Sequence, residues 1–263
     1  MDHVKNNPEA LSELGFGTKL NIFIRSMFIQ SGWNYKGMIS MGFSFALTPI
    51  ARLYYGDDPK AYNHFLRRHM GFFNAHPYFA SFALGAIARL EWDIKDGKVS
   101  VEKEEHFKNV LIGPLGAIGD QLFWSIIRPA TFVLGVLGFY FAKNVHQHLT
   151  ILLSLFILYN IPHLYIRFQG FWRSYKDGYN VCRILKMEHF KYLKWLYMGI
   201  GLVSVGILTG FIAPLPPHSL ELLIFILSIL VAAYLKSQKG RTYLAMTIPL
   251  ALALTLELIS GSL

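Results

Sequence analysis

The amino-acid sequence predicts an all-α membrane protein, and three observations support this prediction. Of its 263 residues, 53% are hydrophobic and only 16% are charged, whereas a typical soluble domain has about 25% charged residues. The last third of the chain carries three long apolar runs, at 195–213, 220–235 and 243–259. Lysines and arginines flank such runs and do not gather into one basic stretch. The net charge of +9 therefore indicates helix ends at a membrane surface, not a nucleic-acid partner.

Composition also divides the chain into three parts. We expect a polar N-terminal tail at 1–19, a core of amphipathic and re-entrant elements at 20–185, and C-terminal transmembrane helices at 186–263. The first fifteen residues are polar and show no signal peptide. The single cysteine, Cys182, excludes an internal disulfide framework and a cysteine-based zinc site.

Two amphipathic segments are expected near the start of the core. Residues 20–33 are rich in Ile, Phe and Met, which is typical of a helix lying in the cytoplasmic membrane surface. Residues 57–73 predict a helix capped by Asp57 or Asp58, with Pro59 in its first turn. Tyr62, Phe65, Leu66 and Met70 would form its apolar stripe, and Lys60, His64, Arg67 and Arg68 would face outward.

The middle of the chain holds shorter apolar segments. Residues 130–142 and 149–161 number thirteen each, or about 20 Å as helix, which is too short to span a bilayer unaided. They are expected to form a re-entrant hairpin or broken spanning helices, which need protein or water over their exposed backbone. The polar stretch 91–109 is expected to be a cytoplasmic connection.

The loops orient the C-terminal runs. The run 195–213 has nineteen residues without a charge, close to the roughly 20 that a spanning helix needs. Basic residues are concentrated in 183–194 and 236–241, and 214–219 has none. The excess of Lys and Arg in cytoplasmic loops then places the C-terminus outside. Each run alone could be a buried helix, but three in series with alternating loop charge favour membrane crossing.

The segment GFFNAHPYFAS, residues 71–81, interrupts the apolar pattern. Asn74 and His76 are uncharged side chains that can both donate and accept hydrogen bonds. Pro77 lacks a backbone N–H and disfavours helical geometry at the preceding residue. The sequence therefore predicts a helix break that carries two neutral polar groups.

A second unusual segment is GPLGAIGDQLFWSIIRPA, residues 113–130. Its glycines recur every three residues, so it is neither a dinucleotide fingerprint nor a phosphate-binding loop. We expect a helix start in which Asp120 caps 121–127. In transporters, glycine-interrupted helices also place polar groups near the bilayer midplane. Asp120 as a plain cap and Asp120 as a site residue are compatible interpretations.

Four stretches of the core carry a family resemblance: RSMFIQSGWNYKGMISMGFSFALTPIARLYYGD, RRHMGFFNAHPYFASFALGAIARLE, IGPLGAIGDQLFWSIIRPA and LYNIPHLYIRFQGFWRSYKDGYNV. In this order they are similar to blocks of the enzyme IID subunit of the mannose/fructose/sorbose-type bacterial phosphotransferase system. The resemblance runs from about residue 20 to about residue 185. One departure is the segment PLPPHS, at 214–219, where family members carry a longer extracytoplasmic segment.

The resemblance implies a multi-pass subunit of the bacterial cytoplasmic membrane that pairs with an enzyme IIC membrane subunit. It implies a trimer of IIC–IID pairs that translocates a hexose sugar, with cytoplasmic enzymes IIA and IIB carrying the phosphate. A histidine such as His76 would then not be a phosphoryl acceptor. No catalytic residue and no cofactor are expected in this chain.

Under this resemblance, the candidate substrate-binding residues are Asn74, His76, Asp120, Trp33 and Asn34. Neutral amide and imidazole groups can bind sugar hydroxyls without the cost of a buried charge. Alternatively, Asn74 and His76 only satisfy the helix break, and Trp33 anchors the membrane interface. No metal site is expected, because His64 and His69 have no adjoining carboxylate or cysteine cluster in the sequence and resemble surface histidines.

Two other functions compete with sugar transport. A structural scaffold that stabilises a partner channel would keep its activity when Asn74, His76 and Asp120 are changed to alanine. A membrane enzyme is disfavoured, because the sequence shows no Ser/His/Asp arrangement and no paired carboxylates at catalytic spacing in an apolar segment.

Overall fold

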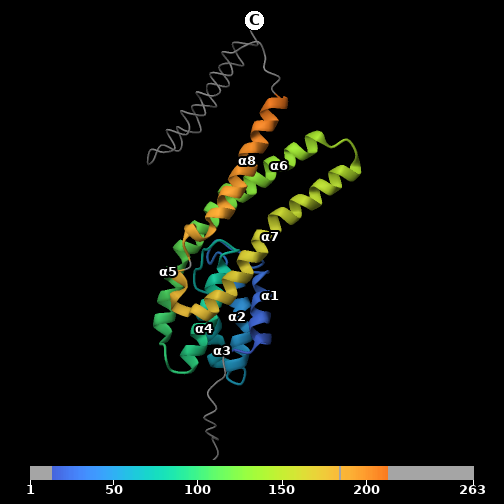
Figure 1. Cartoon of the computed structure of the whole chain (residues 1–263). Helices are drawn as coiled ribbons and strands as arrows, with labels where there is room; N and C mark the ends of the chain where they lie inside the picture. Colours follow the sequence, from blue (N-terminus) through green and yellow to red (C-terminus); the bar gives the residue numbers. More distant parts are fainter. Residues whose placement is uncertain (1–13, 184, 213–263) are drawn as a thin grey trace, which may run out of the picture. The chain divides into compact units, whose positions relative to one another are not determined.

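The computed structural model describes residues 14–183 and 185–212, and all its regular elements are helical (Figure 1). The elements are α1 (Phe16–Ser26), α2 (Ser40–Tyr55), α3 (Pro59–His69), α4 (Ala80–Lys95), α5 (Val101–Gly119), the π-helical segment η1 (Asp120–Ile127), α6 (Arg128–Phe141), α7 (Val145–Asp177), the short 3₁₀ helices η2 (Gly178–Arg183) and η3 (Met187–Phe190), and α8 (Lys191–Ile212). Within these residues, β-pairing is limited to the isolated bridges Asn34–Met38 and Met38–Phe73. The all-α prediction is confirmed.

Helix α4 is the centre of the N-terminal part. It packs against α7, α2 and α5, and its first nine residues, 80–88, are all buried. A Cβ atom on Gly85 would collide with the backbone carbonyl of Phe171, and one on Gly170 would lie 2.6 Å from the Phe82 ring. Small residues that let backbones approach closely are typical of helix pairs in membranes. The α4–α7 pair therefore depends on Gly85 and Gly170.

Helix α3 begins as the sequence predicted. The Asp58 side chain accepts hydrogen bonds from the backbone N–H groups of Lys60 and Ala61, and Pro59 is the first helical residue. The helix ends at His69, and 71–79 is not helical. The predicted helix break at Asn74–Pro77 is therefore confirmed.

The predicted outer face of α3 is partly wrong. His64 and Arg67 are exposed, but the Arg68 side chain is only 4% exposed and His69 is completely buried. Arg68 reaches carboxylates on α4 and α5, and His69 reaches the carboxylate of Glu91 on α4. Because those partners are distant in the sequence, the pattern of α3 alone could not reveal this burial.

Three helical stretches are long and apolar enough to cross a membrane: 101–141, 145–183 and 187–210. The first has 41 residues and joins α5, η1 and α6, and the second has 39 residues. The thirteen-residue segments 130–142 and 149–161 form parts of α6 and α7, which meet at the turn 142–144. Each segment alone is too short to span a bilayer, but less apolar residues beside it continue the helix. The continuation runs through Pro114 in α5 and through Pro162 in α7. The interruption expected in the middle of the chain is a π-helical segment, not a loop.

Asp120 does not start a helix. The residue before it, Gly119, is already helical, and the Asp120 side chain makes no capping hydrogen bond. The cap prediction is therefore wrong, because the glycines at 113, 116 and 119 remain in the helix instead of forming a turn before it.

The chain divides into compact units at 204/205, and the second unit is described only through the end of α8, at Ile212. Residues 195–212 of the expected run 195–213 lie within α8. The runs 220–235 and 243–259, the short segment 214–219 and most of the polar tail lie outside the described residues. The division at 1–19, 20–185 and 186–263 stays a prediction.

Candidate functional site

The helix break at 71–79 lies beside the loop that follows α1. The backbone N–H of Phe73 donates to the carbonyl of Gly37, at 3.2 Å, and the N–H of Ile39 donates to the carbonyl of Phe73, also at 3.2 Å. These bonds pair the two non-helical segments in an extended arrangement. Two sequence blocks that are more than thirty residues apart therefore lie side by side.

His76 is held inside a shell of aromatic rings. It is 2% exposed, and its ring stacks on Phe123 of η1 with centroids 5.2 Å apart and an interplanar angle of 19°. Trp124 and Tyr78 lie 5.1 and 4.9 Å from it between centroids. The π-helical segment thus supplies two of the rings around His76, and such segments are frequent at functional sites.

The hydrogen bonding of His76 defines its tautomer. Its Nδ1 atom accepts from the backbone N–H of Tyr78, at 3.3 Å. Burial, followed by the nearby Arg167, lowers the pKa of His76 to about 4, so the ring is neutral at neutral pH. The remaining proton is then on Nε2, which is buried and has no partner among the described residues. A buried donor without a partner is rare and requires an explanation.

Glycines of α5 allow this close packing. A Cβ atom on Gly119 would collide with Cβ of His76, and one on Gly116 would be 4.0 Å from the carbonyl oxygen of Asn74. Gly113 has open space around it. The glycine-rich segment therefore serves as the surface on which the 74–76 segment lies.

The five candidate residues differ in how they are placed. Asn74, Asp120 and Trp33 are exposed, and the Trp33 ring contacts Tyr35. The Asn34 side chain is engaged by its own turn, because it bonds the backbone of Gly32 and Gly37. The structure brings His76 against η1, whose first residue is Asp120, but the described residues show no side-chain hydrogen bond among the five.

Four residues near His76 were not singled out from the sequence. The Tyr78 ring stacks on His163 of α7, with centroids 3.7 Å apart, and its hydroxyl lies 3.2 Å from that of Tyr159. The Arg167 guanidinium lies over the Tyr78 ring, 5.4 Å from its centroid, and donates to the carbonyl of Ser26. The sequence held a signal for three of them, because polar side chains at 159, 163 and 167 recur every four residues along one face of a helix.

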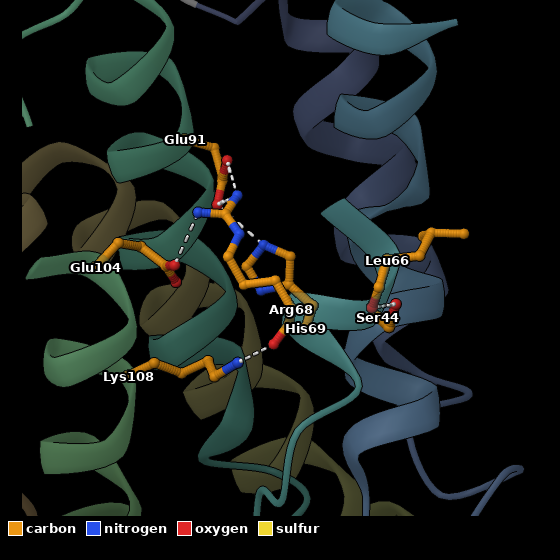
Figure 2. Close-up of polar contacts among 7 residues, drawn as sticks. All are labelled: Ser44, Leu66, Arg68, His69, Glu91, Glu104 and Lys108. Atoms are coloured by element: carbon orange, nitrogen blue, oxygen red, sulfur yellow. Dashed lines mark hydrogen bonds and ion pairs between the residues drawn. The ribbon is translucent and has the colours of Figure 1, made fainter. Parts of the chain in front are cut away.

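A second polar cluster joins α3, α4 and α5, and Figure 2 shows its members pointing toward one another. Nη2 of Arg68 lies 2.7 and 2.8 Å from the two carboxylate oxygens of Glu91, and Nη1 lies 3.3 Å from Oε2 of Glu104. His69 contacts Glu91 through Nε2, at 2.9 Å, and Lys108 Nζ donates to the backbone carbonyl of Arg68, at 3.0 Å. All five side chains are nearly inaccessible to solvent. We call Arg68, His69, Glu91, Glu104 and Lys108 the buried charge cluster.

The charges of this cluster balance. Burial lowers the pKa of His69 to about 3, so the imidazole is neutral and donates its Nε2 proton to Glu91. Burial also raises the pKa of Glu91, and the adjacent Arg68 opposes that rise. Two cations, Arg68 and Lys108, then face two carboxylates. The sequence did not predict the cluster, and the polar stretch 91–109 contributes three of its members.

The cluster contains the atoms of a potential metal site, but its geometry favours an ion-pair network. Ligand atoms of His69, Glu91 and Glu104 lie within 4.8 Å of one another. However, the Arg68 guanidinium already donates to both carboxylates. A divalent cation would have to displace this guanidinium, so we assign no metal to the cluster.

The fold and the site define a polytopic helical membrane protein with a neutral polar site at a helix break. The sequence profile of the PTS system mannose/fructose/sorbose family IID component matches residues 16–215. The chain belongs to this family.

Individual relatives agree with this assignment. The mannose-specific EIID component of Escherichia coli K12 is 32% identical over 168 residues, which cover 62% of this chain and 56% of that protein. The fructose permease IID component of Bacillus subtilis 168 is 29% identical over 191 residues, which cover 72% of this chain and 67% of that protein. The match thus spans little more than half the length of the Escherichia coli relative.

Two solved structures share the fold. One, described as a membrane protein, has a TM-score of 0.69 at 22% identity and covers 95% of this chain and 97% of its own. The other is a cryo-EM structure of the mannose transporter ManYZ with microcin E492, with a TM-score of 0.58 at 23% identity, covering 95% of this chain and 96% of its own.

Proposed function

We propose that this chain is the IID subunit of a sugar-translocating unit, formed with an enzyme IIC partner and served by cytoplasmic IIA and IIB proteins. Membership of the family supports this role. The proposal extends to a trimer of IIC–IID pairs and to a hexose as the transported sugar. The chain delivers the sugar for phosphorylation and has no phosphoryl-carrying residue of its own.

The observation that carries the proposal is the convergence of three sequence blocks at the helix break. The segment 71–79 contacts both the loop around Asn34 and the π-helical segment, and a neutral, unpartnered imidazole N–H lies among aromatic rings. Sugar hydroxyls need neutral donors and acceptors, and aromatic rings can cover the apolar faces of a sugar. Asn74, His76, Asp120, Trp33 and Asn34 remain our candidate sugar ligands, and Tyr78 and Tyr159 join them.

Removing the polar groups of the 74–76 segment is expected to weaken sugar binding. Asn74→Ala and His76→Phe each remove hydrogen-bonding groups, and phenylalanine keeps an aromatic ring against Phe123. Losing one partner of a buried hydroxyl costs about 1–3 kcal/mol, or roughly five- to 150-fold in affinity. Equilibrium binding of mannose, fructose and sorbose to purified IIC–IID complexes would measure the loss.

Lys60→Ala, at an exposed position on α3, is the control and should bind sugar normally. If Asn74→Ala and His76→Phe also bind like the unaltered complex, the segment is only a structural helix break. The scaffold alternative would then account for the chain.

The proposed topology predicts which loops are reachable from outside. We propose that 91–109 and 183–194 are cytoplasmic, and that the 142–144 turn and the C-terminus are outside. In a Cys182→Ser background, an impermeant thiol reagent added to intact cells should label His146→Cys and Ser262→Cys but not Ser100→Cys. Ser100 and His146 are both exposed at helix starts, so accessibility alone would not distinguish them. Labelling of Ser100→Cys without His146→Cys would reverse the orientation.

A further inference from the structure

A cavity lies on the side of α7 that faces the start of α8. It has a volume of about 540 Å³ and is lined by Phe82 of α4 and by residues of α7, η3 and the first two turns of α8. A volume of this size is typical of small-molecule sites. None of the five candidate sugar ligands lines it. It is therefore separate from the site proposed for the sugar.

The cavity is long and has apolar walls. Its lining residues on α7 run from Leu158 to Arg173, fifteen positions that correspond to about 22 Å of helix. Ile161, Ile166 and Leu196 belong to the same lining. A long apolar groove between two candidate spanning helices matches the shape and chemistry of a lipid acyl chain.

One end of the groove is polar and basic. Gln169, Arg173 and His189 line it there, and no acidic residue contributes to the lining among the described residues. The Arg173 side chain is exposed and has no carboxylate partner in the described part of the chain. Beside this end, Lys191 lies over the ring of Tyr192, which itself lines the groove. An aromatic and basic rim of this kind is typical of a helix end in the headgroup region.

We propose that this groove binds an anionic phospholipid, with an acyl chain along α7 and the phosphate at Arg173. Basic pockets between spanning helices on the cytoplasmic side bind anionic headgroups. In the proposed topology this end of the groove lies in the cytoplasmic leaflet, next to the basic segment 183–194. Charge complementarity favours a lipid over an apolar partner helix, because such a helix would fill the groove but leave Arg173 without an anion. The inference does not depend on sugar transport.

The test compares two lipids with identical acyl chains. The full chain, purified in detergent alone and with IIC, is titrated with phosphatidylglycerol or phosphatidylcholine, and bound lipid is counted by native mass spectrometry. We expect tighter binding of phosphatidylglycerol. Arg173→Ala should weaken that binding about fivefold, since one basic residue near the surface contributes about 1 kcal/mol. It should weaken phosphatidylcholine binding less, because the choline cation already offsets the charge of that lipid's phosphate. Arg173→Lys should preserve phosphatidylglycerol binding.

Two further variants separate the alternatives. Arg67→Ala removes another exposed arginine that does not line the groove, and should bind both lipids normally. Leu196→Trp narrows the groove at an exposed position and should reduce the binding of both lipids. The proposal is overturned if Arg173→Ala leaves phosphatidylglycerol binding intact. It is equally overturned if inorganic phosphate displaces the lipid, or if the IIC partner abolishes lipid binding by filling the groove.

Discussion

Glu91→Ala is expected to destabilise the folded chain by about 3–5 kcal/mol, because it removes one partner from a buried ion pair. Arg68 would keep only the longer contact with Glu104, and His69 would lose the acceptor of its Nε2 proton. The free energy of unfolding of the purified protein, measured by chemical denaturation in detergent, would report the loss. The same variant should loosen α3 from α4 and α5, because the cluster joins these three helices.

A matched control is available in the turn that follows α4. Asp96→Ala also breaks an ion pair, with Lys98, but the lysine side chain is 59% exposed. Exposed pairs contribute at most about 1 kcal/mol. Equal effects of Glu91→Ala and Asp96→Ala would show that burial of the cluster does not determine its contribution.

Gly119→Ala is the second substitution for which a large effect is expected. The added methyl group would collide with His76, whose ring is confined by Phe123 and Tyr78. Overfilling a packed site costs about 1–3 kcal/mol. Sugar binding by the IIC–IID complex should fall together with stability, because the 74–76 segment must move away from the end of α5.

Gly113→Ala provides the comparison within the same helix. Nothing lies within 4 Å of the added atom, and alanine is favoured over glycine in a helix by up to about 1 kcal/mol. This variant should therefore be as stable as the unaltered chain or more stable. If both alanines are tolerated equally, contact with Gly119 does not position His76.

The features that sequence patterns predicted correctly are local ones. Asp58 followed by Pro59 is a helix start that can be read within four residues, and Asn74–Pro77 is a helix break for equally local reasons. The all-α class follows from composition and from the length of the apolar runs. The family resemblance located the blocks that converge at the break, although it did not show which of their residues make contact.

The features that were missed depend on distant partners. Arg68 resembles a solvated cation until Glu91 and Glu104, 23 and 36 positions further along, are placed beside it. The role of Gly119 likewise depends on His76, which is 43 residues away. Asp120 has the residue type of a cap and follows glycines, but the helix runs through it, and Gly119 packs against His76. No periodicity within a single helix encodes such contacts.

The π-helical segment affects the direction in which the buried side chains face along the first spanning stretch, 101–141. Buried residues recur every fourth position there, at 111, 115, 119, 123, 127, 131 and 135. In an ideal α-helix a strict four-residue repeat drifts by about 40° per step, or about 240° over these six steps. Such a drift would turn the end of the stripe away from the neighbours that its beginning contacts.

A π-helix has wider turns, closed by i→i+5 hydrogen bonds, and so cancels part of this drift where it occurs. The eight residues of η1 lie in the middle of the repeat and act as an angular correction between α5 and α6. The direction in which the side chains of α6 face depends on how many residues precede it, not on which residues they are. A one-residue insertion in 120–127 would rotate all of α6 by about 100°, whereas a substitution at an exposed position there leaves the angle unchanged.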